Sequence, residues 1–195
     1  MRIYTKKGDD GTTGLLYGGR VRKDAVLIEL NGAVDEAQAA LGVARTHTPR
    51  GGELDSILID LERDLYTLMA EVATAESNRD KLRPGVTLVT EEMVEKLEVR
   101  IDEIAARFEM PTEFVIPGQS SCAAALDVAR TVVRRAERQA VANQIEGSLV
   151  VKYLNRLSDL IWMLARSEEG DARHLARDPS GWTKESAVGG SVDGS

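Results

Sequence analysis

Apolar residues recur at steps of three and four positions along most of this chain, a spacing that places them on one face of an α-helix. The clearest stretch runs from Leu54 to Val72, where leucine, isoleucine, methionine or valine returns at every third or fourth position. Four further stretches show the same pattern, and breaks rich in proline, glycine or polar residues separate them. The pattern predicts five helices, over approximately residues 24–47, 54–75, 90–108, 120–141 and 148–169.

The segments outside this periodicity complete the predicted fold. Asp24, Thr90 and either Ser120 or Ser121 stand where three helices begin, and their oxygens can cap free backbone N–H groups. Residues 1–23 hold five glycines without helical spacing and predict a structured loop, while the Gly, Ser and Asp of residues 178–195 predict a flexible tail. We therefore expect an all-α protein: one domain over residues 1–177, with an antiparallel five-helix bundle over 24–177 behind a glycine-rich N-terminal loop.

Composition excludes several classes of function. The chain has 195 residues, 43% of them hydrophobic, as expected for one folded domain, and its net charge of −7 disfavours non-specific binding to nucleic acid. The single cysteine, Cys122, excludes an internal disulfide and a cysteine-built metal site, and is most simply a small core residue. No signal peptide and no run of about 20 apolar residues is found, so we expect a cytoplasmic protein without membrane contact.

An arginine stripe distinguishes the fourth predicted helix. Arg130, Arg134 and Arg138 stand at i, i+4 and i+8, so their guanidinium groups line one side, with Arg135 and Glu137 beside them. Like charges at this spacing repel by about a few tenths of a kcal/mol per pair, which favours an anion or carboxylates opposite them. A solvated basic face remains the alternative.

Polar stripes on the first and fifth helices offer partners for these arginines. Their placement allows an ion pair of Asp35 with Arg130 or Arg134 across the bundle, although a surface carboxylate is the alternative. The stripes consist of Asn31, Asp35 and Gln38 on the first helix, and of Asn155, Asp159 and Trp162 on the fifth.

The N-terminal loop has a composition suited to phosphate. Its glycines let the backbone approach a ligand, Lys6 and Lys7 can neutralise phosphate charge, and its threonines can donate hydrogen bonds. It lacks the Gly-Lys-Ser/Thr ending of a Walker A loop, which disfavours an ordinary ATPase, and a flexible arm remains the alternative. The two histidines, His47 and His174, lie far apart, and the Glu-x-x-His motifs of a di-iron bundle are absent, so no resident metal site is expected.

Five segments, taken together and in order, resemble the PduO-type ATP:cob(I)alamin adenosyltransferase family. The similarity covers residues 1 to about 170, and each segment alone is a weak signal. Gln119 stands where the family often has glycine, which leaves the shape of the corrinoid-side loop open. The segments are IYTKKGDDGTT (3–13), NGAVDE (31–36), FVIPG (114–118), RTVVRRAER (130–138) and YLNRLSD (153–159).

The resemblance implies transfer of the 5′-deoxyadenosyl group of ATP to the Co(I) of a reduced corrinoid such as cob(I)alamin, with release of triphosphate. It also implies a homotrimer with each active site between neighbouring subunits, and Mg²⁺ on the ATP phosphates. Co(I) is itself a strong nucleophile, so the protein needs only to align the reactants and stabilise the departing triphosphate. A site rich in Arg, Lys and Thr but poor in His and Cys agrees with that task.

Carried over by position, the family's site residues fall on the N-terminal loop and on the fourth and fifth helices. Arg134 is the first choice for a triphosphate contact, because its planar fork matches phosphate oxygens. Arg130 paired with Asp35 is expected to brace the subunit interface. Phe114 is expected on the corrinoid side, where it displaces the lower cobalt ligand, although the residues alone favour a core phenylalanine. The implied ATP-binding residues are Thr5, Lys6, Lys7, Gly8, Thr13, Gly14, Lys23, Arg134, Arg135, Ala136, Glu137, Arg138 and Asn155.

A rival function of a different class stays open at this point. A helical module of this kind could bind ATP without consuming it and report its occupancy to a partner, a hypothesis that detection of triphosphate release excludes. As partners of the chain, the resemblance to the adenosyltransferase family suggests a cobalamin-dependent mutase and a cobalamin reductase.

Overall fold

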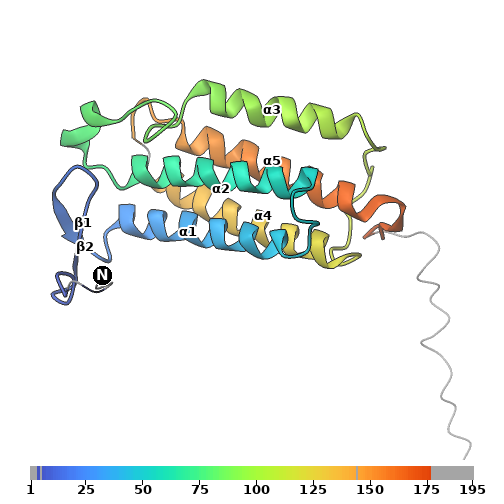
Figure 1. Cartoon of the computed structure of the whole chain (residues 1–195), viewed down its shortest axis with the longest axis horizontal. Coiled ribbons are helices and arrows are strands. Elements are labelled where there is room, and N and C mark those ends of the chain that lie inside the picture. The colour runs from blue at the N-terminus through green and yellow to red at the C-terminus, as the bar shows by residue number, and fades with distance from the viewer. Residues whose placement is uncertain (1–3, 5, 144, 177–195) are drawn as a thin grey trace, which may run out of the picture.

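The computed structural model describes residues 4, 6–143 and 145–176, most of which lie in helices (Figure 1). This confirms the mainly helical fold predicted from the periodicity, whereas Thr5 and the expected tail over 178–195 lie outside the described residues. Two short strands and two 3₁₀ helices accompany the α-helices. The elements are β1 (Thr12–Gly14), β2 (Arg20–Arg22), α1 (Val26–Arg45), α2 (Glu53–Val72), η1 (Glu76–Lys81), α3 (Glu91–Ala105), α4 (Ser121–Ala142), α5 (Val150–Glu169) and η2 (Gly170–Ala172).

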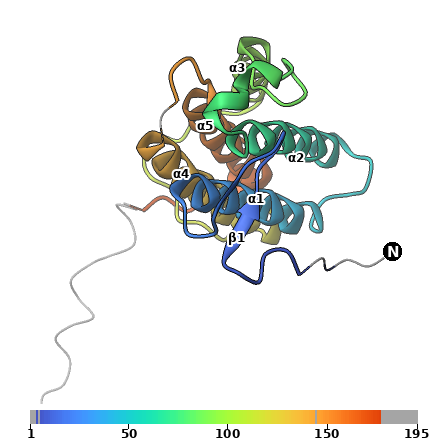
Figure 2. The same cartoon turned by 90° about the vertical axis from the view of Figure 1, so that its left-hand side faces the viewer.

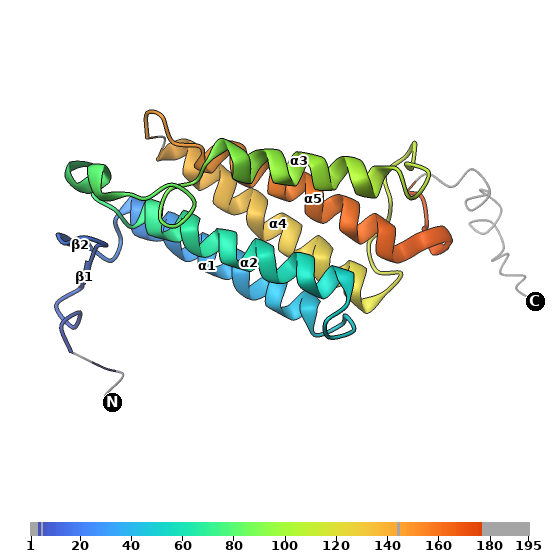
Figure 3. The ribbon, with the colours of Figure 1, turned by 45° about the horizontal axis from the view of Figure 1, so that its top comes forward.

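The α-helices lie side by side along the long axis of the molecule (Figures 1 and 3). α4, which carries the arginine stripe, packs along both α1 and α5. α1 also packs on α2, and α3 lies on α5. The hairpin of β1 and β2 stands at the end of the molecule where α1 begins (Figure 3). The stripe helix is therefore held on two sides, which fixes the directions of its side chains.

Small residues let α4 approach its neighbours. Ala37 of α1 and Ala129 and Ala136 of α4 are completely buried, and leucines such as Leu41 and Leu157 fill the wider spaces beside them. Burying one leucine side chain stabilises a fold by about 1.5–3 kcal/mol, so the two apolar flanks of α4 fix its rotation. The charged residues of α4 are left for the remaining side.

Two of the three predicted helix caps are confirmed. Thr90 and Ser120 each accept a hydrogen bond from the backbone N–H three residues later, at 3.3 and 3.0 Å. The predicted cap at Asp24 is wrong: α1 begins after Ala25, and the Asp24 carboxylate accepts hydrogen bonds from the guanidinium of Arg22 instead. An arginine two residues away outcompetes the backbone for that carboxylate.

The segment before α1 contains a β-hairpin, where the sequence predicted only a structured loop over residues 1–23. β1 pairs antiparallel with β2. Gly18 and Gly19 turn the chain between them with φ angles of 103° and 93°, which glycine adopts without steric cost. The N–H of Leu16 then donates to the carbonyl of Ala73 at 2.8 Å, so the hairpin is fixed to the segment that follows α2 (Figure 2).

Cys122 lies in the core, as the sequence predicted. Burial raises the pKa of its thiol to about 11, so the sulfur stays protonated at neutral pH. The described residues also hold no group of three or more His, Cys, Asp or Glu side chains arranged to bind a metal ion. Over the same part of the chain, every helix is too short or too polar to cross a bilayer.

Candidate functional site

The predicted arginine stripe lies on the outer side of α4. Arg134 has half of its side chain exposed, and its one ionic contact among the described residues is distant, from Nη1 to Glu137 Oε2 at 4.0 Å. Arg138 Nη1 donates to the carbonyl oxygen of Arg134 at 3.0 Å, which folds it over the preceding turn. Arg134 therefore keeps most of its guanidinium open to an anion. Ala136 is completely buried on the opposite side, so its side chain does not reach the surface where its predicted ATP contact was expected.

A chain of polar contacts joins α3, α5 and α4 beside Arg134. Arg156 donates to Glu98 Oε1 on α3 at 2.8 Å and to Asn155 Oδ1 at 2.9 Å. Asn155 Nδ2 in turn donates to Glu137 Oε1 at 2.9 Å. The structure thus brings Glu137 and Asn155, two of the predicted site residues, together next to Arg134.

Arg135 lies on the α1 side of α4 and forms a short ion pair with Glu36. A hollow of about 470 Å³ opens beside this pair, lined by residues of α1 and α4 that include Gly32 and Gln139. Among the described residues, the buried Oε1 atom of Gln139 has no hydrogen-bond partner. A polar recess therefore adjoins the stripe.

The predicted ion pair of Asp35 with Arg130 or Arg134 does not form within one chain. Arg130 Nε donates to Asp127 Oδ1 on its own helix at 3.1 Å. Asp35 is exposed and makes no ion pair with any described residue. The reason is helical phase: Glu36, about 100° further round α1, is the carboxylate that faces α4. Asp35 is left open to another molecule.

Gly8 and Arg20 shape the predicted phosphate-binding segment. A Cβ at Gly8 would lie 3.2 Å from both Lys23 Nζ and the carbonyl oxygen of Thr12, so glycine lets the ammonium group approach. Arg20 Nη2 donates to the Lys7 carbonyl at 2.5 Å and to Thr12 Oγ1 at 2.6 Å, which ties the segment to the hairpin. Of the other predicted residues, Lys6, Lys7 and Lys23 are exposed, and Thr13 and Gly14 lie on β1.

Phe114 is a surface residue, so its interpretation as a core phenylalanine is wrong. Its side chain is 88% exposed. The backbone from Phe114 to Ile116 is held by the segment after η2: Ile116 N donates to the His174 carbonyl at 2.8 Å, and Ala176 N donates to the Phe114 carbonyl at 2.6 Å. The ring is therefore presented to solvent from an anchored backbone, as an apolar ligand contact requires.

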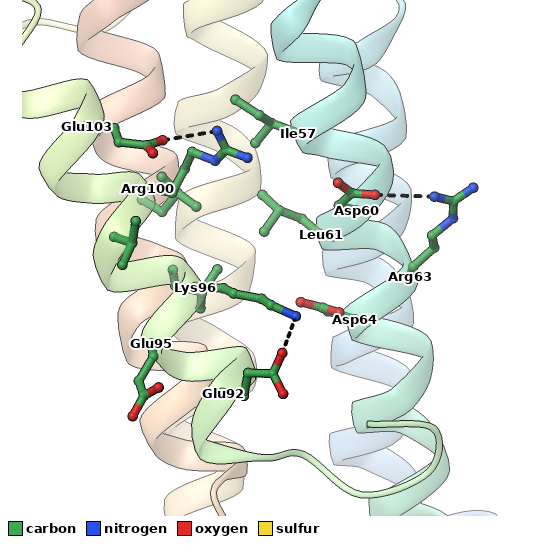
Figure 4. Close-up of a pocket in the computed structure, with 13 residues that line it drawn as sticks. Ile57, Asp60, Leu61, Arg63, Asp64, Glu92, Glu95, Lys96, Arg100 and Glu103 are labelled. Carbon is green, nitrogen blue, oxygen red and sulfur yellow. Dashed lines mark hydrogen bonds and ion pairs between the residues drawn. The ribbon is translucent and has the colours of Figure 1, made fainter. Parts of the chain in front are cut away.

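A larger groove, of about 710 Å³, separates α2 from α3 (Figure 4). The buried side chains of Leu61 and Leu97 line it, together with charged residues of both helices. Lys96 pairs with Glu92 at 2.8 Å, and Figure 4 shows its ammonium group directed toward Asp64. None of the predicted site residues lines this groove.

Asp64 is expected to make stability depend on pH. Burial raises the pKa of its carboxyl above the ordinary value of 3.8, although Tyr153 Oη donates a hydrogen bond to it at 2.9 Å. Because the folded state then binds the proton more readily, this contribution to stability is complete below the unfolded pKa and is lost as the pH rises through the folded pKa. Asp64→Asn should therefore stabilise the chain, relative to the unchanged protein, by more at about pH 7 than at about pH 4.

Urea unfolding at the two pH values measures this difference. Asp60→Asn, which removes an exposed carboxylate at the edge of the same groove, is the matched control and should show a much smaller pH dependence. A stability gain from Asp64→Asn that shrinks toward neutral pH contradicts the argument.

Sequence reasoning missed three residues that shape these surfaces: Glu36, Arg20 and Asp127. Asp127 could have been found, because it stands three residues before Arg130 and such pairs are neighbours on a helix. The role of Arg20 depends on the hairpin, for which the Gly18-Gly19 pair was the available turn signal. Glu36 could not be distinguished from Asp35 before the rotation of α1 was known.

These features define a class: a mainly helical protein with exposed arginines on one helix and, at one end, a β-hairpin that Lys23 directly follows. The cobalamin adenosyltransferase family matches residues 3–168. The chain belongs to this family.

Named relatives and solved structures agree with the assignment. The chain is 40% identical over 171 residues to a corrinoid adenosyltransferase of Citrobacter freundii, covering 86% of this chain and 95% of the relative. It is 37% identical over 172 residues to the corrinoid adenosyltransferase of Bacillus subtilis, covering 85% and 86%. A solved structure of a variant PduO-type ATP:corrinoid adenosyltransferase from Lactobacillus reuteri, complexed with cobalamin and ATP, matches with a TM-score of 0.79 and 28% identity, covering 91% of this chain and 100% of that one.

Proposed function

We propose that this chain transfers the 5′-deoxyadenosyl group of ATP to the Co(I) of a reduced corrinoid such as cob(I)alamin. Family membership over residues 3–168 is the observation that carries the proposal. Cobalt supplies the electron pair for the new Co–C5′ bond, the bond from C5′ to the triphosphate oxygen breaks, and triphosphate leaves with those electrons. The protein supplies alignment and charge stabilisation, for which a site of arginines and lysines is suited.

The stripe of α4 and the hairpin are the proposed ATP site. Arg134, with its open guanidinium, is suited to bind triphosphate oxygens, and the contact of Asn155 with Glu137 holds its surroundings in place. Lys23, packed over Gly8, offers a second positive charge from the hairpin side. Mg²⁺ is proposed to enter with ATP as part of the substrate, bridging phosphate oxygens.

We propose further that each subunit is an antiparallel five-helix bundle and that three subunits assemble with the sites between them. Within one chain the hairpin is attached to the residue that follows α2, while the stripe faces outward from α4, so a second subunit can complete the site. Asp35 is exposed and suited to reach Arg130 of a neighbouring copy. Val43 and Val128, on α1 and α4, are more than half exposed and supply apolar area for such an interface. Light scattering after gel filtration measures the assembly directly.

We also infer a reducing compartment such as the cytoplasm, which the buried free thiol of Cys122 supports. In that setting a cobalamin reductase is the proposed source of Co(I), and a cobalamin-dependent mutase is a proposed user of the product.

Phe114→Ala is expected to impair the reaction more strongly from Co(II) than from Co(I). The proposed role of the ring is to displace the lower cobalt ligand, which eases reduction of Co(II) and is not needed once Co(I) is supplied. We expect a loss of about tenfold or more with Co(II) corrinoid and a reductant, and a smaller loss with pre-reduced corrinoid. Because the side chain is 88% exposed, the unfolding free energy should change by less than about 0.5 kcal/mol. Equal losses from both starting states contradict this role.

The test of the function is an anaerobic absorbance assay with Mg²⁺–ATP and chemically reduced cob(I)alamin. Loss of the Co(I) band with formation of a light-sensitive alkylcobalamin, dependent on both the protein and ATP, is the expected result. ATP binding without alkylcobalamin or triphosphate would overturn the transferase and favour the nucleotide-sensing module.

A further inference from the structure

A row of alternating charges leads from the end of α5 to the arginine stripe of α4. Arg166 Nη2 donates to Glu169 Oε1 at 3.0 Å and to Asp127 Oδ2 at 2.5 Å. The other oxygen of Asp127 accepts from Arg130 Nε at 3.1 Å. Glu169, Arg166, Asp127 and Arg130 therefore form a continuous row in which each charge touches its opposite.

Three members of this row are almost completely withdrawn from water. Arg166 is 2% exposed, and Asp127 and Glu169 are each 5% exposed, whereas the Arg130 side chain, at 26%, marks the outer end. The ring of Trp162 covers Arg166, with the guanidinium carbon 5.6 Å from the ring centroid. Two buried carboxylates share one buried guanidinium, so the row becomes neutral only with Arg130 in place. A buried charge without a partner is costly, and this holds Arg130 against Asp127.

We propose that Asp127 is a positioning residue for Arg130, and that Arg166 and Glu169 hold Asp127 for this task. Asp127 takes the Nε atom of Arg130 and leaves both terminal nitrogens without a partner among the described residues. Those nitrogens form the outward fork that can bind a carboxylate of a second subunit. The inference rests on the proposed function, in which Arg130 serves a site between subunits, and it extends that site to the carboxyl-terminal end of α5.

The first measurement is independent of activity: the ¹⁵N–¹H signal of the Arg130 Nε–H group in the full chain, assigned by its loss in Arg130→Lys. A guanidinium held by a carboxylate gives a sharp signal because the proton exchanges slowly with water. Asp127→Asn should broaden or remove this signal. Asp55→Asn is the matched control, since Asp55 is 6% exposed and lies on α2, where it accepts from Arg45 Nε at 3.0 Å and from the Gly51 N–H at 2.9 Å; it should leave the Arg130 signal unchanged.

The second measurement is a double-mutant cycle in the cob(I)alamin assay. In the chain that keeps Arg130, Asp127→Asn should lower kcat/KM by about ten- to a hundredfold, as misplacement of a positioned group does. It should cause no further loss of activity in the Arg130→Ala background, and its lowering of Tm should shrink there, because removing both charges leaves the buried row neutral again. A residue that serves only the fold gives additive losses instead.

An unchanged Arg130 signal in Asp127→Asn, or additive losses of activity, overturns the proposal. If Asp127→Asn does not fold, Glu169→Gln loosens the row from its far end and should still weaken the same signal. If the unchanged chain forms no alkylcobalamin, the proposed function fails, while the Arg130 signal still decides whether Asp127 positions Arg130.

Discussion

Replacement of Arg134 by alanine is expected to lower kcat/KM for adenosyl transfer by about a hundred- to a thousandfold, as loss of a group that stabilises departing charge does. The reason lies in its surroundings. Its guanidinium is half exposed and its contact with Glu137, at 4.0 Å, is long, so little of its donor capacity is used within the chain. Those donors remain for the oxygens of the triphosphate, whose charge grows as the bond to C5′ breaks. The anaerobic cob(I)alamin assay measures the loss.

The fold should survive this substitution, because Arg134 carries no buried contact. Circular dichroism and thermal unfolding of Arg134→Ala should therefore match those of the unchanged chain. Arg63→Ala is the matched control: Arg63 is also an exposed helical arginine with one carboxylate, Asp60, three residues away. It should keep full activity. Arg134→Lys retains the positive charge but not the planar guanidinium fork, so its activity should lie between that of Arg134→Ala and that of Arg63→Ala. Full activity in Arg134→Ala removes the arginine from its proposed role.

The helices could be predicted from the sequence because one large contribution to stability, the burial of an apolar face at helical spacing, decides where they form. α2 illustrates this, since Leu58, Leu65 and Leu68 are completely buried, as their spacing required. The ends of the helices were less certain, because apolar burial contributes little there. The third helix was expected to continue to Phe108, whereas α3 ends at Ala105. The hairpin was missed because strands of three residues are too short to show an alternating pattern.

The candidate site could be predicted only as far as a single helix defines it. Residues on one helix keep fixed relative directions, so the stripe containing Arg134 followed from spacing alone. Which residue of another element meets that stripe depends on the rotation of each helix about its axis. Gln38 was expected to face the arginines, yet its amide donates to the carbonyl of Glu62 on α2 at 2.9 Å. Resemblance to a family supplied expectations that periodicity could not, including a corrinoid-side role for Phe114, whose exposed ring is available for such a contact.

The largest loss of stability from a polar substitution is expected at Glu71, near the end of α2. This carboxylate is completely buried and accepts hydrogen bonds from three separate segments: Arg79 at 2.9 Å, the Val89 N–H at 2.8 Å and the Ser148 hydroxyl at 2.7 Å. Glu71→Ala removes the shared acceptor, so a guanidinium, an amide and a hydroxyl each lose the oxygen to which they donate. Breaking a buried pair in this way costs about 3–5 kcal/mol of unfolding free energy, measured by urea denaturation.

Two comparisons separate burial from charge in this result. Glu103→Ala removes a helical carboxylate that pairs with Arg100 at 3.1 Å but has about half of its side chain exposed, and should cost less than about 1 kcal/mol. Glu71→Gln keeps the shape of the side chain and one acceptor oxygen, so it should lose less unfolding free energy than Glu71→Ala. A Glu71→Ala loss no larger than that of Glu103→Ala would mean that the three segments hold without their common carboxylate.

Glu71 also links stability to the proposed nucleotide site. The hairpin is attached to the chain two residues further on, where the Leu16 N–H donates to the Ala73 carbonyl at 2.8 Å. Loosening this end of α2 should therefore release the hairpin that carries Lys23. At temperatures where Glu71→Ala remains folded, we expect KM for ATP to rise more than kcat falls, because a displaced hairpin weakens ATP binding while Arg134 stays in place. A lower kcat with an unchanged KM would place the hairpin outside the ATP site, even if the loss of stability is as large as expected.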